Sequence, residues 1–366
     1  MTPLRIVIAG GGTGGHLFPG IAVARELLRR RPDAQITFAG TARGIESRVV
    51  PREGFQLDQL RSAGLKGMSL AARLRGVLLL PASGLDAWRI VSRRAPQLVI
   101  GVGGYSSGPV VLAAAVRRIP TLLLEQNAVP GLTNRLLARF VSAAAVTFES
   151  TVTFFGRRGF VTGNPVRPEF FESVPDARPE GPPRILIFGG SQGAHAINLA
   201  MVEAAPRLAA HGGGMAITHQ TGERDLEYVR DGYRRAGLTA RVEPFLYAMD
   251  REMKAADLVV CRAGATTIAE LTAAGRAAVF IPLPTAADDH QRRNAEVLAR
   301  AGAAELLEQQ GLTGERLAER IVALALDQEK RSAMSRAARG LAKPDAARAI
   351  VDRALTLALS GARADG

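Results

Sequence analysis

The chain has 366 residues, of which 47% are hydrophobic and 22% are charged, a length and balance typical of two globular domains. Its single cysteine, Cys261, excludes an internal disulfide framework and favours a reducing compartment. We find no signal-peptide pattern, and no apolar run reaches the roughly 18 to 20 residues of a spanning helix. We therefore do not expect an integral membrane protein.

The net charge of +13 lies entirely in the first part of the chain. Residues 1–160 contain 21 Lys and Arg against 8 Asp and Glu, whereas residues 161–366 contain 26 of each. The alternative explanation is a coding bias toward arginine. Such a bias would spread the excess of positive charge evenly along the chain, which is not observed. The basic first half therefore favours an anionic partner, either phospholipid head groups or nucleic acid.

Short apolar runs alternate with helical patterns through the first half. We predict strands at 5–9, 35–39, 97–102, 121–125, 144–148 and 160–162. Helices between them include 17–30, 107–118 and 131–140. Each connection is long enough for a crossover helix, so the sheet should be parallel.

A proline-rich stretch at 164–183 predicts a linker, after which the pattern restarts. Strands are predicted at 184–188, 215–219, 240–245, 258–261, 278–282 and 304–307, with helices that include 194–210, 265–274 and 289–301. Three helical segments follow. We expect an α/β fold with two Rossmann-like, doubly wound parallel-sheet domains, 1–163 and 184–341, facing across a cleft. A C-terminal helix at about 342–366 would pack back on the first domain.

Glycine-rich turns follow the first strand of each predicted domain. RIVIAGGGTGGH (5–16) and RILIFGGSQGAH (184–195) share an apolar run, a glycine turn and a histidine. The backbone N–H groups of such a turn, at the start of a helix, can hold an anion. We predict a diphosphate at Gly189–Gly193 and an imidazole base, His16, at the first turn, because histidine titrates near neutral pH. The alternative is a turn without a ligand and a structural histidine.

Gly10, Gly12 and Gly15 also match the dinucleotide-binding pattern G-x-G-x-x-G. That pattern needs an acidic residue about 20 positions further on to hold a ribose. The second predicted strand, in QITFAGTARG (35–44), ends without a carboxylate. A nicotinamide-dependent dehydrogenase is therefore disfavoured.

Two later strand-to-helix turns carry polar side chains. CRAGATTIAEL (261–271) places Glu270 near the start of a helix, where a carboxylate can accept both hydroxyls of a ribose. A capping or solvated glutamate is the alternative. DDHQRRNA (288–295) presents three side chains that suit sugar hydroxyls, His290, Gln291 and Asn294.

Eight segments together resemble the MurG family of peptidoglycan glycosyltransferases across nearly the whole chain. They are GGGTGGHLFPGIAVA at 10–24, GGYSSGP at 103–109, EQNAVPGLTNRLLA at 125–138, GNPVR at 163–167, GGSQGA at 189–194, HQTG at 219–222, CRAGATTIAEL at 261–271 and DDHQRRNA at 288–295. The resemblance implies a GT-B fold and an inverting transfer of GlcNAc from UDP-GlcNAc, without a metal or other cofactor. The acceptor would be the C4 hydroxyl of N-acetylmuramic acid in undecaprenyl-diphosphate-linked muramoyl-pentapeptide. The sequence contains no D-x-D motif, in agreement with a metal-independent reaction.

Matched by position, the resemblance implies roles for individual residues. Donor binding would involve Thr13, Gly14, Gly15, Asn127, Arg167, Gly190, Ser191, Gln192, Leu246, Met249, Arg262, Thr266, Glu270, His290 and Gln291. Acceptor binding would involve Thr13, His16, Tyr105, Asn127 and Asn134, with His16 as the catalytic base. Two positions depart from the family pattern: His290, where some relatives have glutamine, and His195, where arginine is common.

The lipid-linked acceptor implies a peripheral protein at the cytoplasmic face of a bacterial inner membrane. Anionic lipids and other cell-wall synthesis proteins would be partners, and cell shape and division would depend on the product. The segment 68–94 mixes apolar and basic residues that suit such a surface. The membrane patch would comprise Leu78, Leu79, Leu80, Leu85, Trp88, Arg75 and Arg89. The alternative is that these leucines form buried core.

Two other functions remain open. A UDP-GlcNAc 2-epimerase shares the fold and the donor, but the GGTGGH and GGYSSG segments resemble the transferase instead. A nucleic-acid-binding protein would explain the charge. The basic half contains no recognisable nucleic-acid motif or run of aromatic stacking residues, so we expect no nucleic-acid partner.

Overall fold

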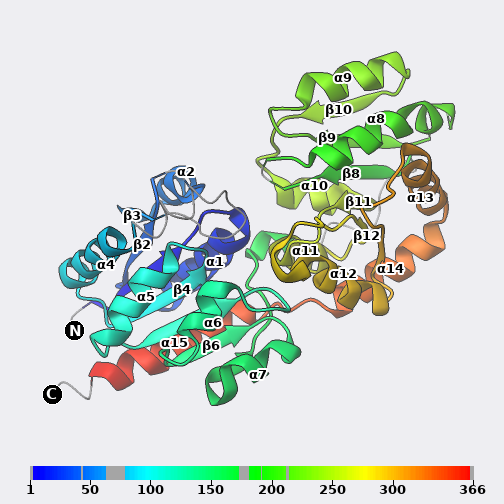
Figure 1. Cartoon of the computed structure of the whole chain (residues 1–366). Helices are drawn as coiled ribbons and strands as arrows, with labels where there is room; N and C mark the ends of the chain where they lie inside the picture. The colour runs from blue at the N-terminus through cyan, green and yellow to red at the C-terminus, as the bar shows by residue number, and fades with distance from the viewer. Residues whose placement is uncertain are drawn as a thin grey trace. The chain divides into compact units, whose positions relative to one another are not determined.

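The computed structural model describes residues 3–42, 44–62, 79–172, 181–190, 192–211 and 214–362, which form two compact units. The first unit combines Met1–Arg167 with Lys343–Gly366, and the second is Pro168–Ala342 (Figure 1). The chain therefore begins and ends in the same unit. Among the described helices, none has the length and apolar character needed to span a bilayer.

The first unit is built on a seven-stranded parallel sheet. In spatial order its strands are β3 (Gln56–Gln59), β2 (Gln35–Gly40), β1 (Arg5–Gly10), β4 (Leu98–Gly103), β5 (Thr121–Glu125), β6 (Ala143–Val146) and β7 (Gly159–Val161). The chain order reverses between β1 and β4. Their carboxyl ends therefore flank the switch point at which sheets of this kind bind ligands.

Helices cover both faces of this sheet. They are α1 (Gly14–Arg30), α2 (Glu46–Arg52), α4 (Leu80–Arg94), α5 (Ser107–Val116), α6 (Leu132–Leu137), α7 (Val152–Phe155) and α15 (Ala346–Ala362). Ile6 and Ile8 of β1 belong to the core shared with α1 and α15, whereas Val7 and Ala9 belong to the core shared with α4 and α5. Burial on both faces explains why the strands read as continuous apolar runs.

The last helix, α15, completes the first unit. Ile350, Val351 and Ala354 are buried in the core that α1 also lines. Asp352 makes an ion pair with Arg30 of α1, 2.5 Å between oxygen and nitrogen. The final helix therefore belongs to the first unit although the second unit precedes it in the chain.

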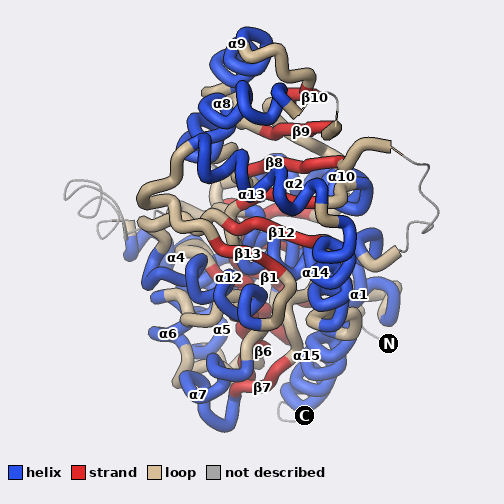
Figure 2. The backbone as a smooth tube through the Cα atoms, turned by 90° about the vertical axis from the view of Figure 1, so that its right-hand side faces the viewer, coloured by secondary structure: helices blue, strands red, loops and turns tan. Residues whose placement is uncertain are grey.

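The second unit repeats the design with six parallel strands. Their spatial order is β10 (Ala240–Glu243), β9 (Ala216–Gln220), β8 (Arg184–Phe188), β11 (Leu258–Cys261), β12 (Ala277–Phe280) and β13 (Ala304–Leu306) (Figure 2). Its helices are α8 (His195–Ala210), α9 (Leu226–Arg235), α10 (Met249–Ala255), α11 (Ala265–Ala274), α12 (His290–Arg300), α13 (Gly314–Leu326) and α14 (Gln328–Gly340). Here the switch point lies between β8 and β11.

The predicted α/β class and the two parallel sheets are confirmed, and each predicted strand has a counterpart within two residues. The structure adds β3, whose sequence QLDQ contains no apolar run. Its Asp58 is buried, and the cost of burying the carboxylate is offset because Arg93 and Arg94 of α4 each donate a hydrogen bond to it at 2.7 Å. Within the predicted linker, Pro168–Phe170 forms a short 3-10 helix (η3), and residues 173–180 lie outside the described residues.

Candidate active site

The turn after β1 packs directly against the turn after β4. Gly10, Gly11 and Gly12 have φ values of 142°, 145° and 85°, and Gly103 and Gly104 have values of 96° and 79°. These conformations favour glycine. A Cβ atom on Gly10 would lie 2.4 Å from the Gly103 carbonyl oxygen, and one on Gly104 would lie 2.5 Å from that of Gly11. Only glycine allows the two backbones to approach this closely.

A buried glutamate, Glu46 at the start of α2, holds the first glycine turn. Its carboxylate accepts hydrogen bonds from the Gly12 N–H (2.7 Å), the Thr41 N–H (2.8 Å) and the Thr41 hydroxyl (2.8 Å). The Gly12 N–H therefore donates to a protein carboxylate, and it is not available to a phosphate. Sequence analysis missed Glu46. Its one signal is that it is the sole acidic residue between Asp33 and Glu53.

His16, in the first turn of α1, is oriented by Gln126, which follows β5. The Gln126 Nε2 group donates to the Val102 carbonyl oxygen at 2.9 Å, so its Oε1 is the acceptor that lies 3.2 Å from His16 Nδ1. Nδ1 therefore carries the proton, and the lone pair of the neutral imidazole is on Nε2. A Cβ atom on Gly103 would lie 2.7 Å from Nδ1, so the ring also packs against the β4 turn.

Asn127 and Asn134 are connected through Glu125, the last residue of β5. The Glu125 carboxylate accepts from the Asn127 N–H (3.0 Å), the Gly131 N–H (2.9 Å) and the Asn134 side-chain amide (2.9 Å). Asn134 also donates to the Leu124 carbonyl oxygen at 3.0 Å. Glu125 and Asn134 are both 3% exposed, whereas Asn127 is half-buried. This network, whose carboxylate the sequence analysis did not single out, fixes the loop that carries Asn127.

The other candidates of the first unit lie around the start of α1. Tyr105 is exposed, and its ring lies 3.4 Å from a Cβ atom built on Gly12. Thr13–Gly15 form the first residues of the helix and its cap, with Thr13 and Gly15 exposed. The Arg167 guanidinium lies over the Phe18 ring of α1, 5.2 Å from the ring centroid.

The second unit has its own glycine turn after β8. Gly190 and Gly193 have φ values of 98° and 76°. A Cβ atom on Gly193 would lie 1.8 Å from the Thr221 carbonyl oxygen, and one on Gly222 would lie 2.1 Å from that of Gln192. The turn therefore packs backbone to backbone on the loop after β9. A Cβ atom on Gly190 would meet no described atom within 4 Å, and the Gln192 side chain is exposed.

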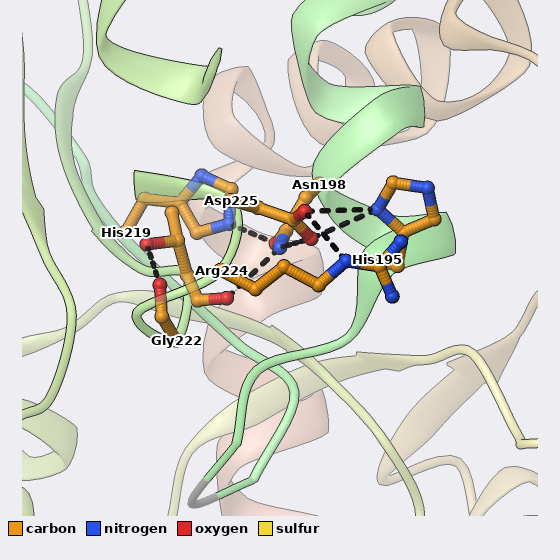
Figure 3. Close-up of polar contacts among 7 residues, drawn as sticks. His195, Asn198, His219, Gly222, Arg224 and Asp225 are labelled. Atoms are coloured by element: carbon orange, nitrogen blue, oxygen red, sulfur yellow. Dashed lines mark hydrogen bonds and ion pairs between the residues drawn. The ribbon is translucent and has the colours of Figure 1, made fainter. Parts of the chain in front are cut away.

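A chain of hydrogen bonds links the start of α8 to this neighbouring loop and to α9. Figure 3 shows its part from His195 through Asp225 and Asn198 to His219. His195 Nδ1 lies 2.9 Å from the Asp225 carboxylate, to which Asn198 Nδ2 donates at 2.8 Å. Asn198 Oδ1 accepts from His219 Nε2 at 3.0 Å, and His219 Nδ1 accepts from the Tyr233 hydroxyl at 2.7 Å. Burial lowers the pKa of His219 to about 3, so its ring is neutral at physiological pH. Sequence analysis missed this network.

Arg262, directly after β11, ties the end of that strand to the end of β12. Its guanidinium donates to the carbonyl oxygens of Ile281 (2.9 Å) and Pro282 (3.1 Å). Burial lowers the pKa of Arg262 to about 10, which leaves it positively charged at neutral pH. Thr266 and Glu270 are four residues apart on α11 and therefore share one face of the helix, and both are largely buried.

The start of α12 is attached to the same edge of the sheet. Its first residue, His290, is half-buried. The Gln291 side-chain oxygen accepts from the Leu283 N–H at 3.0 Å, and the Asn294 amide donates to the Ala263 carbonyl oxygen at 3.3 Å. These two bonds hold α12 to the loops that follow β12 and β11.

The predicted donor residues thus divide between the units. In the second unit the described ones follow the carboxyl ends of β8, β10, β11 and β12: Gly190, Gln192, Leu246, Met249, Arg262, Thr266, Glu270, His290 and Gln291. Leu246 is buried and Met249 is half-buried, and Ser191 lies outside the described residues. Thr13, Gly14, Gly15, Asn127 and Arg167 belong with His16 in the first unit.

The predicted membrane segment falls partly on α4. Leu80, Leu85 and Trp88 are 49%, 57% and 48% exposed, so their alternative assignment to the buried core is wrong. Arg89 is exposed and Leu79 is half-buried. The remaining two predicted residues, Arg75 and Leu78, lie outside the described residues.

Two family models match the chain. The glycosyltransferase family 28 N-terminal domain matches residues 6–146, and the glycosyltransferase family 28 C-terminal domain matches residues 184–350. Each matched segment contains one of the two parallel sheets almost completely. The chain belongs to glycosyltransferase family 28.

Curated relatives of nearly the same length carry one name. The UDP-N-acetylglucosamine--N-acetylmuramyl-(pentapeptide) pyrophosphoryl-undecaprenol N-acetylglucosamine transferase of Anaeromyxobacter sp. (strain K) is 50% identical, over 97% of this chain and 93% of the relative. The protein of the same name from Pelobacter propionicus is 48% identical, over 96% of this chain and 99% of the relative.

Solved structures separate the transferase from the epimerase. MurG of Acinetobacter baumannii matches with a TM-score of 0.76 and 33% identity, over 97% of this chain and 100% of that one. The UDP-GlcNAc 2-epimerase of Neisseria meningitidis, bound to UDP-GlcNAc, matches with a TM-score of 0.68 and the same coverage, but only 15% identity. The second likeness shows the fold alone.

The contact between Gly103 and His16 predicts a catalytic defect in Gly103→Ala. The new Cβ atom would lie 2.7 Å from His16 Nδ1, so we expect the imidazole to be displaced from Gln126. The turnover number should fall about 100-fold, within the range for loss of an oriented base. Steady-state kinetics would measure this, with Gly84→Ala on α4 as the control, since a Cβ atom there would lie within 4 Å of no described atom. Equal rates in both variants would contradict the prediction.

The buried, neutral His219 predicts a loss of stability at acidic pH. Its pKa is about 3 in the folded chain against an ordinary value of 6.5, so unfolding takes up a proton between these values. This residue therefore adds stability that is complete above pH 6.5 and declines by about 1.4 kcal/mol per pH unit below it. Hydrogen exchange of β9 amides, corrected for intrinsic rates, gives the free energy of unfolding at each pH. This free energy should fall less steeply from pH 6 to pH 4 in His219→Gln than in the wild type. The control is the exposed His211→Gln, and identical slopes in all three proteins would refute the assignment.

Proposed function

We propose that this chain transfers GlcNAc from UDP-GlcNAc to the C4 hydroxyl of N-acetylmuramic acid in undecaprenyl-diphosphate-linked muramoyl-pentapeptide, known as lipid I. The reaction inverts the anomeric carbon and forms the β(1→4)-linked disaccharide of lipid II. The names of relatives at about 50% identity over nearly the whole chain support the substrates. The observation that carries the mechanism is the hydrogen bond between Gln126 and His16, which puts the basic lone pair on Nε2.

His16 is the proposed general base. Its Nε2 takes the proton from the C4 hydroxyl as that oxygen attacks the anomeric carbon from the face opposite the diphosphate. The bond from the anomeric carbon to the diphosphate oxygen breaks, and its electron pair leaves with UDP. The transition state has oxocarbenium character. Gln126 keeps the reactive tautomer before the step and accepts from the imidazolium Nδ1–H after it.

The departing diphosphate is proposed to lie on the second glycine turn. The backbone N–H groups of Gly190 and Gln192 and the start of α8 would face the charge that develops as UDP leaves. A preorganised donor of this kind typically contributes about 3 kcal/mol at an oxyanion site. Arg262 adds a fixed positive charge at the neighbouring strand end. Because these groups are held in place by the fold, they need little rearrangement during the reaction.

The other donor and acceptor residues are assigned by their places around these two turns. Glu270 would accept from the ribose hydroxyls, Leu246 and Met249 would frame the uracil, and His290 and Gln291 would contact GlcNAc. On the acceptor side, Tyr105 and Asn127 would contact the muramoyl sugar. Asn134 is 3% exposed and bonded to Glu125, so we assign it to support of the Asn127 loop.

The surface of α4 and α5 is proposed to bind anionic lipids of the cytoplasmic leaflet. Leu85 and Trp88 project from α4, and Leu112 and Val116 of α5 are 43% and 67% exposed. The Arg117 guanidinium lies over the Trp88 ring, 5.2 Å from its centroid. Apolar side chains surrounded by cations suit the boundary between head groups and acyl chains.

Replacing the proposed base tests the mechanism. His16→Ala should lower the turnover number by about 10²–10⁴-fold at saturating donor, because the attacking hydroxyl loses its proton acceptor. UDP release is measured with and without a lipid-linked muramoyl-peptide acceptor, and His211→Ala is the matched control. Wild-type turnover in His16→Ala would exclude the assigned role. Conversion of UDP-GlcNAc in the absence of acceptor would indicate the epimerase instead.

The lipid surface is tested separately by vesicle sedimentation. Leu85→Ser should reduce binding to vesicles of 30% phosphatidylglycerol in phosphatidylcholine by about threefold or more, because an exposed apolar anchor is lost. Leu359→Ser, on α15 and similarly exposed at 60%, should bind as the wild type does. Equal binding of the wild type to pure phosphatidylcholine would remove the electrostatic part of the proposal.

A further inference from the structure

A groove of about 1020 Å³ lies where the strands of the second sheet begin. It is lined by Arg184, the first residue of β8, by Ala216, the first residue of β9, and by Asp257 and Arg276, which directly precede β11 and β12. The glycine turn and Arg262 lie at the carboxyl ends of these strands instead. The groove is therefore separate from the candidate donor site.

One face of α14 forms a wall of this groove. The lining residues of the helix are three or four positions apart along that face: Gln328, Arg331, Ser332, Ser335, Arg336 and Arg339. Met334 and Ala338 of the same helix are buried elsewhere in the unit. The face toward the groove therefore presents guanidinium, amide and hydroxyl donors, with no apolar side chain among the lining residues of the helix.

Positive charge is concentrated in the groove. Five arginines line it, and among the described residues the one lining carboxylate is Asp257. The second unit as a whole, Pro168–Ala342, contains 21 Lys and Arg against 23 Asp and Glu. The cluster therefore does not follow from the composition of the unit. Like charges gathered on a concave surface strengthen the attraction of a small counter-ion.

Two of the arginines also support helix ends. Arg331 donates to the Leu324 carbonyl oxygen at 2.6 Å and to that of Ala325, at the end of α13. Arg339 packs on Gly275, the left-handed residue that ends α11, where a Cβ atom would lie 2.6 Å from its Nε. Helix C-termini carry partial negative charge, so cations are favourable here. Support of helix ends accounts for the position of Arg331 and, in part, for that of Arg339. It does not account for Arg184 and Arg336, which are exposed and line the same groove.

We propose that this groove binds a phosphate-bearing anion through Arg184, Arg336 and Arg339, with the hydroxyls of Ser332 and Ser335 as further donors. A guanidinium group can donate two parallel hydrogen bonds to phosphate oxygens. Such charge-assisted hydrogen bonds are stronger than those between neutral groups. The volume of about 1020 Å³ accommodates a diphosphate with an organic group attached. The phosphate belongs either to a soluble molecule or to a lipid head group, and the experiment distinguishes these sources.

The test compares two double variants of the full-length chain. Arg184→Ala/Arg336→Ala removes two exposed arginines of the groove, and the control Arg230→Ala/Arg234→Ala removes two exposed arginines of α9 in the same unit. Inorganic diphosphate is titrated calorimetrically at low ionic strength with UDP-GlcNAc present in excess. The groove variant should bind diphosphate about tenfold or more weakly, whereas the control should match the wild type.

Vesicles of 30% phosphatidylglycerol in phosphatidylcholine provide the second arm. A loss confined to diphosphate identifies a soluble ligand, and a loss of vesicle binding identifies a lipid head group; either supports the groove. If the groove variant binds both probes as tightly as the control does, the proposal is overturned, and helix-end support by Arg331 and Arg339 is the one role left to the groove arginines. Circular dichroism and thermal unfolding of each variant establish that it is folded. The readouts are independent of transferase activity, so they stand whether or not the proposed function is correct.

Discussion

Close backbone contact between neighbouring turns is the constraint on which both candidate sites depend. A side chain at Gly10 or Gly193 would overlap a carbonyl oxygen of the facing turn, so the contact exists only with glycine at these positions. In the first unit this contact sets the distance between the start of α1 and the end of β4. It thereby also sets the position of the His16 ring, which packs against Gly103. In the second unit it sets the start of α8 against the loop after β9. Each unit thus places a helix start at the switch point of a parallel sheet.

The two turns share this backbone design but differ in electrostatics. In the first, the Glu46 carboxylate engages the Gly12 N–H and brings negative charge beside the turn. In the second, Asp225 is engaged by His195 and Asn198, and a Cβ atom on Gly190 would meet none of the described atoms within 4 Å. An anionic ligand is therefore less favourable at the first turn than at the second. This difference supports the proposal that the first turn positions a base and that the second turn binds a diphosphate.

The strands and glycine turns could be predicted because their signals are local: apolar runs buried on both faces, and glycine where φ is positive. The edge strand β3 carries no such signal. The hydrogen-bond partners of the turns lie far away in the chain, 34 residues from Gly12 to Glu46 and 110 from His16 to Gln126. No local pattern encodes pairings at these separations, since they exist only after the sheet has formed. For the same reason the spacing of arginines on α14 is visible in the sequence, but the position of this helix against the starts of β8, β9, β11 and β12 is not.

The return of the chain to the first unit for α15 bears on how the protein is made. The second unit, Pro168–Ala342, is an uninterrupted segment inserted into the first, with a core of its own. The core of the first unit includes Ile350 and Val351, which leave the ribosome only after the whole inserted unit. The inserted unit can therefore finish folding on the nascent chain while the unit that was synthesised earlier still exposes part of its interior. A polypeptide that stops after the insertion would keep that apolar surface open and would be a natural target for chaperones and proteases.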